Sequence, residues 1–397
     1  MRKKILILAG THFQIPVIEY AKSHGHYVIT CDNKPENPGH KAADEYVNMS
    51  TTNLDGVLEV AKTRKIDGIL AYASDPAALA ASYVSEALHL PGNSYNSVLT
   101  LSDKGFFRKF LTENDFPVPV YKVFKSYNEA SFFYNTLKRS VFVKPVDSSG
   151  SKGITRLSPG ADLKSPFNYA LEFSRKGEVI IEEEIERKGP HIHGEAFIYV
   201  GKIIFMLLGD QYFCKANACT PISTILPSLF HSDLMSEIEL KLTRLIKLVD
   251  FKTGGLNIEI IRDQNDKIYF LEIGARNGGN FMPELARMAT GFNMAGANVN
   301  AVLNEPLDFS YSFPEDMFYT QLILHSHSNG IYSGFNLDKQ FIDNIKYKIE
   351  YFLKGDNVQI YRDSRFVIGV FLFKFNDKVK CSRLINYIIQ NNLINLI

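Results

Sequence analysis

Residues 257–276 read NIEIIRDQNDKIYFLEIGAR, two apolar runs joined by a polar turn. The composition of the runs predicts two β-strands, and the turn at Asn265–Asp266 predicts that they pair as an antiparallel hairpin. In that hairpin Glu259 and Glu272 lie opposite each other on one face of the sheet, with Cβ atoms about 5 Å apart. Two like charges at this separation destabilise the hairpin unless something positive lies between them.

A divalent cation would remove the repulsion between these two carboxylates. The strand neighbours of Glu259 and Glu272 are apolar, so the pair does not look like part of a solvated charged surface. Hard oxygen ligands suit Mg²⁺, which can bridge carboxylates and nucleotide phosphates. The pattern therefore predicts Glu259 and Glu272 as metal ligands. The alternative is a surface hairpin that carries two unrelated glutamates.

Arg276 follows the second glutamate in a glycine-containing turn, ahead of a predicted helix over Met282–Met288. A guanidinium held there could stabilise the charge that develops on a transferring phosphoryl group or a tetrahedral intermediate. Arg276 is therefore the candidate catalytic residue. The alternative is a structural arginine–carboxylate pair.

A second motif, VKPVDSSGSKG at residues 143–153, joins a predicted strand at 141–144 to another at 154–157. Small residues leave backbone N–H groups free to face an anion, and lysines supply positive charge. The candidate phosphate-binding residues here are Lys144, Ser148, Ser149, Gly150, Ser151 and Gly153. The motif is not a Walker A sequence, and the alternative is a flexible hairpin loop.

The first 95 residues alternate short apolar runs with amphipathic segments. This alternation predicts parallel strands at 4–9, 27–31 and 68–72, separated by helices at 15–24, 54–63 and 76–88, in a doubly wound sheet. A dinucleotide site is not expected, because the first turn carries Gly10 alone instead of the fingerprint G-x-G-x-x-G.

Later segments predict further elements. Ser102 is a plausible N-cap for a helix that ends near Asn114. Apolar residues at helical spacing predict a long amphipathic helix from Leu234 to Val249. The last ninety residues mix strand and helix patterns, as in a small α+β unit.

Bulk properties are those of an ordinary packed protein. The chain has 397 residues, 45% of them hydrophobic, and a net charge of +1, so no nucleic-acid or membrane-surface partner is indicated. No apolar stretch reaches membrane-spanning length. The four cysteines lack zinc-ligand spacing and are expected to be free thiols in a reducing cytoplasm.

In their order along the chain, these motifs resemble the ATP-grasp superfamily, most closely its carboxylate–amine and L-amino-acid ligase branch. The resemblance covers nearly the whole chain. It implies an α/β and α+β multidomain protein. An N-terminal Rossmann-like domain with the doubly wound parallel sheet would occupy residues 1–95. An ATP-grasp nucleotide-binding region would occupy 96–305, with a lid at about 116–183, and a small C-terminal α+β subdomain 306–397.

The resemblance also implies roles for individual residues. The stretch ending in Lys104 resembles the one with the first nucleotide-binding lysine, and Val143-Lys-Pro145 resembles the second. The run IIEEEI at 180–185 resembles the strand and hinge against which adenine packs, implying contacts from Glu182, Glu184 and Ile185. Gly194-Glu195 resembles the position whose glutamate holds the ribose hydroxyls. Glu259 and Glu272 match the two metal-binding glutamates, and Arg276 matches the catalytic arginine.

Two departures from the family pattern stand out. Many members carry asparagine two residues after the second glutamate, where this chain has Gly274. The stretch between Glu182 and Glu195 is longer than usual, with an insertion over Glu186–Ile192.

The implied function is a ligase that uses ATP and Mg²⁺, or Mn²⁺, to join a carboxylate to an amine through an acyl phosphate. Its partners would be small molecules, with a homodimer as one option. Alternatives are an enzyme of the same fold that carboxylates or formylates a nucleotide precursor, a dehydrogenase, and a nucleotide-binding module without turnover. Residues 209–228 are expected near the acceptor site, with a plain core-and-loop segment as the alternative. His191 and His193 are expected on the surface, and the alternative is that they act as bases.

Overall fold

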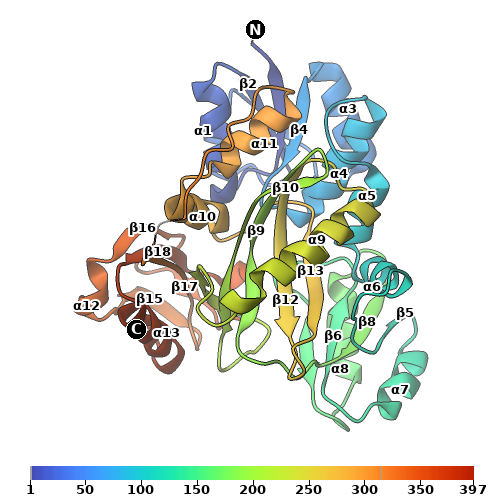
Figure 1. The fold of residues 1–397 in the computed structure, drawn as a ribbon, viewed down its shortest axis with the longest axis vertical. Helices are drawn as coiled ribbons and strands as arrows, with labels where there is room; N and C mark the ends of the chain where they lie inside the picture. Colours follow the sequence, from blue (N-terminus) through green and yellow to red (C-terminus); the bar gives the residue numbers. More distant parts are fainter. Residues whose placement is uncertain (1, 314) are drawn as a thin grey trace.

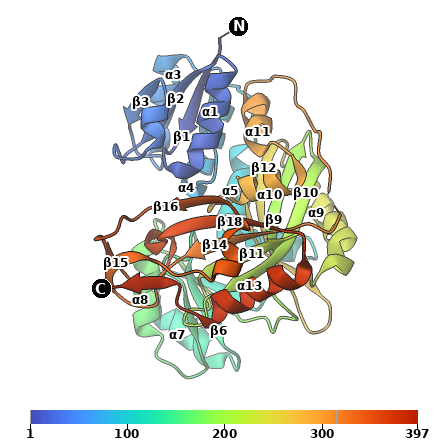
Figure 2. The ribbon, with the colours of Figure 1, turned by 90° about the vertical axis from the view of Figure 1, so that its left-hand side faces the viewer.

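The computed structural model describes residues 2–313 and 315–397. Three bodies of structure surround a set of long central strands (Figure 1). The N-terminal sheet lies at one end of the molecule, a small antiparallel sheet lies at the opposite end, and the C-terminal strands flank the long strands (Figures 1 and 2). No helix among the described residues is both long and apolar enough to cross a membrane.

The N-terminal sheet has four parallel strands in the order β3-β2-β1-β4. Its strands are β1 (Lys4–Leu8), β2 (Tyr27–Asp32), β3 (Glu45–Asn48) and β4 (Gly68–Ala71). Its helices are α1 (Ile15–Ser23), α2 (Gly39–Ala42), α3 (Leu54–Arg64) and α4 (Asp75–Ala87). The predicted doubly wound sheet is confirmed. Strand β3 was not predicted, because its four residues carry no apolar run.

Helices cover both faces of this sheet. One face packs against α3 and α4, and the other packs against α1 and α11 (Met294–Val302). Helix α11 comes from far along the chain, and its Ala295 and Val299 join the same apolar cluster as Ile5 and Ile7. The N-terminal sheet is therefore closed by a helix that follows the long central strands in sequence.

Two helices lead away from the N-terminal sheet, α5 (Tyr95–Ser102) and α6 (Lys104–Glu113). The predicted N-cap Ser102 is wrong, since Ser102 ends α5. Asp103 caps α6 instead, because its side chain accepts a hydrogen bond from the Phe106 backbone N–H.

A four-stranded antiparallel sheet follows, in the order β5-β8-β6-β7. Its strands are β5 (Tyr121–Phe124), β6 (Val141–Pro145), β7 (Thr155–Leu157) and β8 (Val179–Glu183), with α7 (Tyr127–Thr136) and α8 (Lys164–Phe173) packed on it. The predicted strand–loop–strand unit is confirmed as β6, the 146–154 loop and β7.

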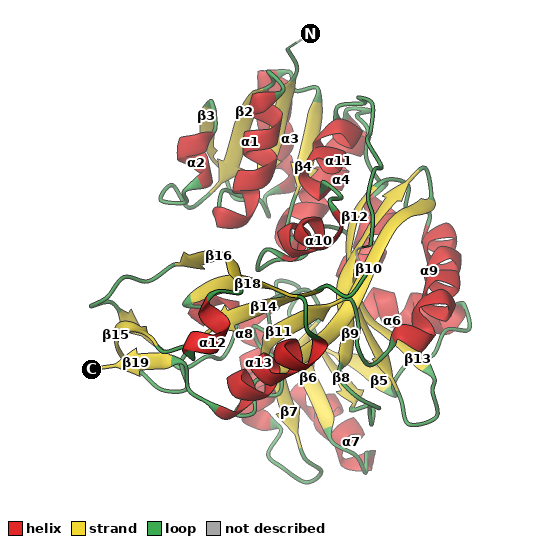
Figure 3. Cartoon of the chain, turned by 60° about the vertical axis from the view of Figure 1, so that its left-hand side comes forward, coloured by secondary structure: helices red, strands yellow, loops and turns green. Residues whose placement is uncertain are grey.

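An eight-stranded antiparallel sheet forms the centre of the molecule, in the order β13-β12-β9-β10-β11-β14-β18-β16 (Figure 3). Its strands are β9 (His191–Tyr199), β10 (Lys202–Phe213), β11 (Pro221–Leu226), β12 (Gly254–Arg262), β13 (Ile268–Gly274), β14 (Phe318–Leu324), β16 (Ile345–Glu350) and β18 (Gly369–Phe375). Its helices include α9 (Met235–Val249), α10 (Met282–Thr290) and α13 (Lys378–Gln390). The predicted long helix is confirmed as α9.

The C-terminal residues add three strands to this sheet, and β14 pairs directly with β11. A separate small sheet is built from β15 (Gly330–Phe335), β17 (Asn357–Val358) and β19 (Ile394–Leu396), beside α12 (Lys339–Ile342). The sheet thus runs across the proposed boundary at residue 306, and the division of the chain into three domains stays a prediction.

Candidate active site

The two glutamates of the predicted hairpin face each other across β12 and β13. Glu259 pairs with Glu272 in the antiparallel register, and a bulge follows Glu259. The predicted pairing is therefore confirmed. Burial, followed by the charge of Glu272, raises the pKa of Glu259 to about 7. Lys104 Nζ lies 3.5 Å from a carboxylate oxygen of Glu272, so positive charge reaches the pair from α6.

Alternation along the strands explains why polar groups gather on one face of the sheet. Ile192, Ile258 and Ile260 belong to the apolar cluster that packs against α9. Glu259 stands between two of them in sequence and is directly opposite His193 of β9. The same β-strands therefore present a dry face to α9 and a polar face to the opposite side.

Both glutamates line a cavity of about 630 Å³, here called the glutamate cavity. It lies between the eight-stranded sheet and the sheet of β5–β8. Of the residues predicted from the sequence, seven line it: Lys104, Lys144, Glu182, Glu184, Ile185, Glu259 and Glu272. Phe142, Ile154, Ile261 and Leu271 supply apolar walls.

The two predicted lysines are held by acceptors at the cavity wall. Lys104 Nζ donates to the Ser148 carbonyl at 2.8 Å, and Lys144 Nζ donates to Glu182 at 2.7 Å. Arg108 of α6 forms a second ion pair with Glu182, at 2.6 Å. Burial opposes ionisation of Glu182, but the two cations hold its pKa at about 2. Glu182 is therefore a fixed anion that orients Lys144.

The segment after β8 forms one end of the glutamate cavity. Glu184 receives two hydrogen bonds from Arg156 Nε, at 2.8 and 2.9 Å, and one from Arg156 Nη2, at 2.6 Å. This pair fixes the Glu184 side chain toward β7, while Glu184 and Ile185 still line the cavity. The segment predicted as the hinge thus begins with a carboxylate that Arg156 holds in place.

The two halves of the small-residue loop at 147–153 contact different parts of the structure. Ser148 and Ser149 line a narrow cleft together with Lys104, Glu272 and Asp75. Gly150 and Ser151 dock elsewhere: the Gly150 carbonyl accepts from the Ser364 N–H at 3.0 Å, and Ser151 Oγ donates to the Cys219 carbonyl at 2.7 Å. Gly150, Ser151 and Gly153 all have positive φ, which suits a loop with several sharp turns.

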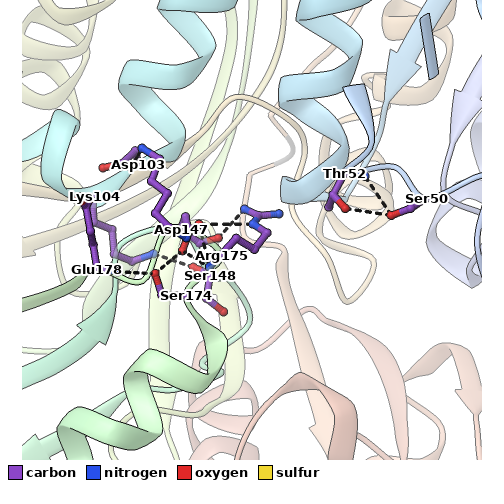
Figure 4. A network of polar contacts seen from close by, with 10 residues as sticks. Ser50, Thr52, Asp103, Lys104, Asp147, Ser148, Ser174, Arg175 and Glu178 are labelled. Carbon is purple, nitrogen blue, oxygen red and sulfur yellow. Dashed lines mark hydrogen bonds and ion pairs between the residues drawn. The ribbon is translucent and has the colours of Figure 1, made fainter. Parts of the chain in front are cut away.

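Asp147 anchors the start of this loop (Figure 4). Its carboxylate accepts hydrogen bonds from Ser174 Oγ and from the backbone N–H groups of Arg175 and Lys176. Arg175 returns a bond from Nη2 to the Asp147 carbonyl at 2.6 Å. The loop is therefore tied to the segment between α8 and β8, next to the Lys104–Ser148 contact that the same figure shows.

Several solved structures share the fold of this chain over essentially its whole length. Phosphoribosylglycinamide synthetase from Anaerococcus prevotii has a TM-score of 0.76 over 100% of both chains, at 21% identity. L-amino acid ligase from Bacillus licheniformis has a TM-score of 0.80 over 100% of this chain and 98% of that one, at 18% identity. N5-carboxyaminoimidazole synthetase from Staphylococcus aureus, complexed with ADP, has a TM-score of 0.76 over 98% of each chain, at 16% identity.

The chain has the ATP-grasp fold. Among curated proteins, the phosphoribosylamine–glycine ligase of Methanosarcina acetivorans is 29% identical over 192 residues, covering 46% of this chain and 43% of that protein. The formate-dependent phosphoribosylglycinamide formyltransferase of Prochlorococcus marinus is 26% identical over 188 residues, covering 46% and 48%. The match thus spans less than half the length of these curated relatives. No protein-family model matches the chain.

Within the ATP-grasp fold, the ribose role predicted for Glu195 does not fit the position of this residue. Glu195 is fully buried and accepts hydrogen bonds from Asn257 Nδ2, Asn277 Nδ2 and the Gly278 N–H. Burial raises its pKa to about 7, against the effect of these bonds. The side chain therefore supports the turn that follows Arg276, since Asn277 and Gly278 donate to it. It does not line the glutamate cavity.

The predicted surface placement of two histidines is also wrong. His191 lines the glutamate cavity, and His193 is buried with its ring nitrogens against Thr224 Oγ1 and Asn257 Nδ2, at 3.2 and 3.0 Å. Burial lowers the pKa of His191 to about 3 and that of His193 to about 4, so both rings are neutral. Sequence analysis assigned residues 186–192 to an insertion, whereas β9 already begins at His191.

Arg276 forms a bidentate ion pair with Asp75, at 2.7 and 2.6 Å. Sequence analysis gave such an arginine–carboxylate pair as the alternative to a catalytic role for Arg276. Burial works against ionisation of Asp75, yet the guanidinium keeps its pKa below the ordinary value. Asp75 also lines the narrow cleft with Lys104 and Glu272, so the pair sits at the edge of the site. The catalytic role of Arg276 stays a prediction.

Gly274 leaves room for that guanidinium. A Cβ atom at this position would lie 2.9 Å from Arg276 Cζ, which is closer than side chains tolerate. The asparagine that many ATP-grasp proteins carry here would therefore collide with the arginine.

Two site residues escaped sequence analysis, Asp75 and Arg108, and a third, His191, was placed on the surface. Asp75 and Arg276 are 201 positions apart, and nothing local in Ser74-Asp75-Pro76 distinguishes an ion-pair partner from a helix start. Arg108 could have been suspected, since it shares one face of α6 with Lys104 at a spacing of four. Within the expected acceptor segment 209–228, Phe213, Ala218 and Cys219 line the glutamate cavity, while Lys215 is exposed.

Proposed function

We propose that the chain is an ATP-dependent ligase that joins a carboxylate to an amine through an acyl phosphate, releasing ADP and phosphate. The observation that carries this proposal is the convergence of Glu259, Glu272, Lys104 and Lys144 on one cavity of about 630 Å³. A cavity of this size suits a nucleotide. It combines apolar walls for a base with cations for phosphates and paired carboxylates for a metal.

Two features of the structure support a Mg²⁺ site at the paired glutamates. The carboxylates are direct cross-strand neighbours, and burial with mutual repulsion raises the pKa of Glu259 to about 7. A bound cation would favour the ionised form of Glu259 and end the repulsion. Mn²⁺ has the same preference for oxygen ligands and could replace it. When bound, the ion would neutralise phosphate charge during phosphoryl transfer.

Residues of the chain bind the nucleotide, exclude water and stabilise the developing charge. Lys104 and Lys144 bind phosphate oxygens, and Glu182 holds Lys144 in place. Phe142 and the hinge at Glu184–Ile185 receive the adenine, and His191 lies on the wall where the ribose would pass. The 147–153 loop covers the phosphates and keeps water from the acyl phosphate. Arg276 stabilises the oxyanion that forms when the amine attacks.

We further propose that the small-molecule substrates enter through a second cavity, of about 610 Å³, beside α10. Its wall includes the apolar side chains of Ile15 and Phe281 and the charged groups of Glu19, Glu284 and Arg287. Opposite charges around an apolar surface suit an amino acid, which agrees with the L-amino-acid ligase branch. The cavity begins where the turn after Arg276 enters α10.

A second candidate function is formylation or carboxylation of a nucleotide precursor. It is favoured by the 26% identity to a formate-dependent phosphoribosylglycinamide formyltransferase. In both candidates a carboxylate is activated by ATP, so the glutamate cavity would work in the same way. The carboxylate and its acceptor distinguish them.

An ADP-release screen over pairs of carboxylates and amines, with Mg²⁺ present, tests these proposals. The panel should include amino acids, formate and bicarbonate. Release that requires both an ordinary carboxylate and an amine supports the ligase, whereas release with formate or bicarbonate supports the second candidate. Glu272→Ala should abolish the release, and full activity in that variant would refute the metal role. Sedimentation of the active protein would test the homodimer.

A further inference from the structure

Three metal-binding side chains from distant parts of the sequence meet at one edge of the eight-stranded sheet. Cys214 directly follows β10, and His325 directly follows β14, with His327 two residues later. Strands β10 and β14 are both antiparallel to β11, which lies between them. They therefore run in the same direction and end at the same edge, which brings residues 111 positions apart together. Local cysteine and histidine spacing cannot reveal such a cluster.

The ligand atoms of the three residues all lie within 4.8 Å of one another. The Nε2 atoms of His325 and His327 are 3.3 Å apart. In a tetrahedral zinc site with Zn–N bonds of about 2.05 Å, two ring nitrogens are about 3.3 Å apart. The spacing of the imidazoles thus already matches the edge of a zinc tetrahedron, and Cys214 needs only a small side-chain adjustment.

The imidazole of His325 is oriented as in a metal ligand. Its Nδ1 lies 2.7 Å from the Ile323 carbonyl, to which an Nδ1–H donates. This bond fixes the tautomer and leaves a lone pair on Nε2, facing His327 and Cys214. Tyr361 packs on the ring at 4.8 Å and is itself held by a bond from its hydroxyl to the Pro221 carbonyl at 2.8 Å.

The surroundings suit a soft divalent ion. Cys214 and His325 are buried, at 4% and 6% exposure, whereas His327 is half-buried and offers a path to solvent. Thiolate and imidazole select zinc-like metals, whereas the paired glutamates of the other site prefer Mg²⁺. We propose that Cys214, His325 and His327 form a binding site for Zn²⁺ or a similar transition-metal ion, with water as the fourth ligand.

Binding would replace the Cys214 thiol proton with the metal and release that proton to solvent. It would also tie the ends of β10 and β14 together at the 214–220 segment. That segment accepts the Ser151 hydroxyl through the Cys219 carbonyl. The metal site therefore adjoins the base of the phosphate loop, yet it shares no ligand with the glutamate cavity.

Cobalt titration of the full-length protein tests the site without reference to catalysis. The protein is first freed of metal with a chelator, and excess Mg²⁺ is then added to occupy the paired glutamates. We expect about one equivalent of Co²⁺ to bind with the visible bands of a tetrahedral ion and a thiolate-to-cobalt charge-transfer band. Zn²⁺ should then displace it. If the folded protein gives neither band, the 3.3 Å contact is only a hydrogen bond between histidines, and the proposal fails.

Two variants and a matched control locate the ion. Cys214→Ser should remove the charge-transfer band, and His327→Gln should weaken Co²⁺ binding at least tenfold. Cys219→Ser changes a thiol in the same segment that is outside the cluster, so it should leave both signals unchanged. Because His327 is half-buried, its variant stays informative even if Cys214→Ser does not fold. A band that survives Cys214→Ser but is lost in Cys219→Ser would overturn the assignment.

Discussion

Glu259 links the charge of the site to the stability of the fold. Its pKa is about 7 in the folded protein and about 4.5 when unfolded, so the folded state binds more protons between these values. Stability without metal should therefore fall as pH rises through this window, by up to about 3 kcal/mol. Glu259→Gln should make the profile shallower, with the raised pKa of Glu195 and of Glu284 keeping part of the pH dependence, and should be more stable than wild type at pH 8 in chelator. Urea unfolding at pH 5 and 8 measures this, with exposed Glu129→Gln as control. Parallel profiles would show that Glu259 does not carry the effect.

A substitution at Gly274 tests whether activity depends on the position of the Arg276 guanidinium. Gly274→Asn restores the residue that many ATP-grasp proteins have, yet its Cβ would lie 2.9 Å from Arg276 Cζ. We expect kcat to fall about 10²-fold, the usual effect of losing one oxyanion donor, with KM for ATP little changed. Gly279→Ala is the matched control in the same turn, because the nearest atom to its Cβ would be 3.9 Å away. Improved Mg²⁺ affinity without loss of kcat would contradict this account.

At the scale of elements, sequence analysis predicted the features that depend on neighbouring residues and missed those that depend on distant ones. The hairpin β12–β13 places both glutamates within one supersecondary unit, so its register followed from the turn and the strand period. The pair Asp75–Arg276 and the cluster around Cys214 depend on which distant strands end side by side, and no sequence period encodes that. Sequence analysis placed His191 and His193 on the surface, whereas β9 begins at His191 and buries His193.

Helix α9 packs on the apolar face of the strands that carry Glu259. The stability contributions of its buried and exposed faces can be compared by mutation. Leu242 is fully buried against the apolar face of the strands that carry Glu259, whereas Leu240 is 72% exposed. Leu242→Ala should lower the free energy of unfolding by about 2–5 kcal/mol, while Leu240→Ala should change it by less than about 0.5 kcal/mol. Chemical denaturation measures both. Equal effects would mean that α9 does not pack as described.

At the scale of the molecule, three separate parts of the fold supply residues to the site. Asp75 begins helix α4 on the N-terminal sheet, Lys144 and the 147–153 loop come from the small antiparallel sheet, and Glu272 comes from the central sheet. The C-terminal region touches the loop through Ser364. Such a site works only when the parts are held together, so loosening one anchor should disturb coupling before it disturbs folding.

Asp147 is the anchor whose loss should uncouple ATP use from ligation. Its carboxylate holds the start of the phosphate loop through bonds from Ser174 and Arg175 (Figure 4) and from the Lys176 N–H. In Asp147→Ala the loop should cover the phosphates less often, so water reaches the acyl phosphate and amide formation falls by roughly tenfold or more. Phosphate release should fall less, which raises the phosphate-to-amide ratio. Asp162→Ala removes a carboxylate of the same body that also accepts a backbone N–H but lies outside the loop, and it should keep the wild-type ratio. An unchanged ratio in Asp147→Ala would mean that closure of the loop does not depend on this anchor.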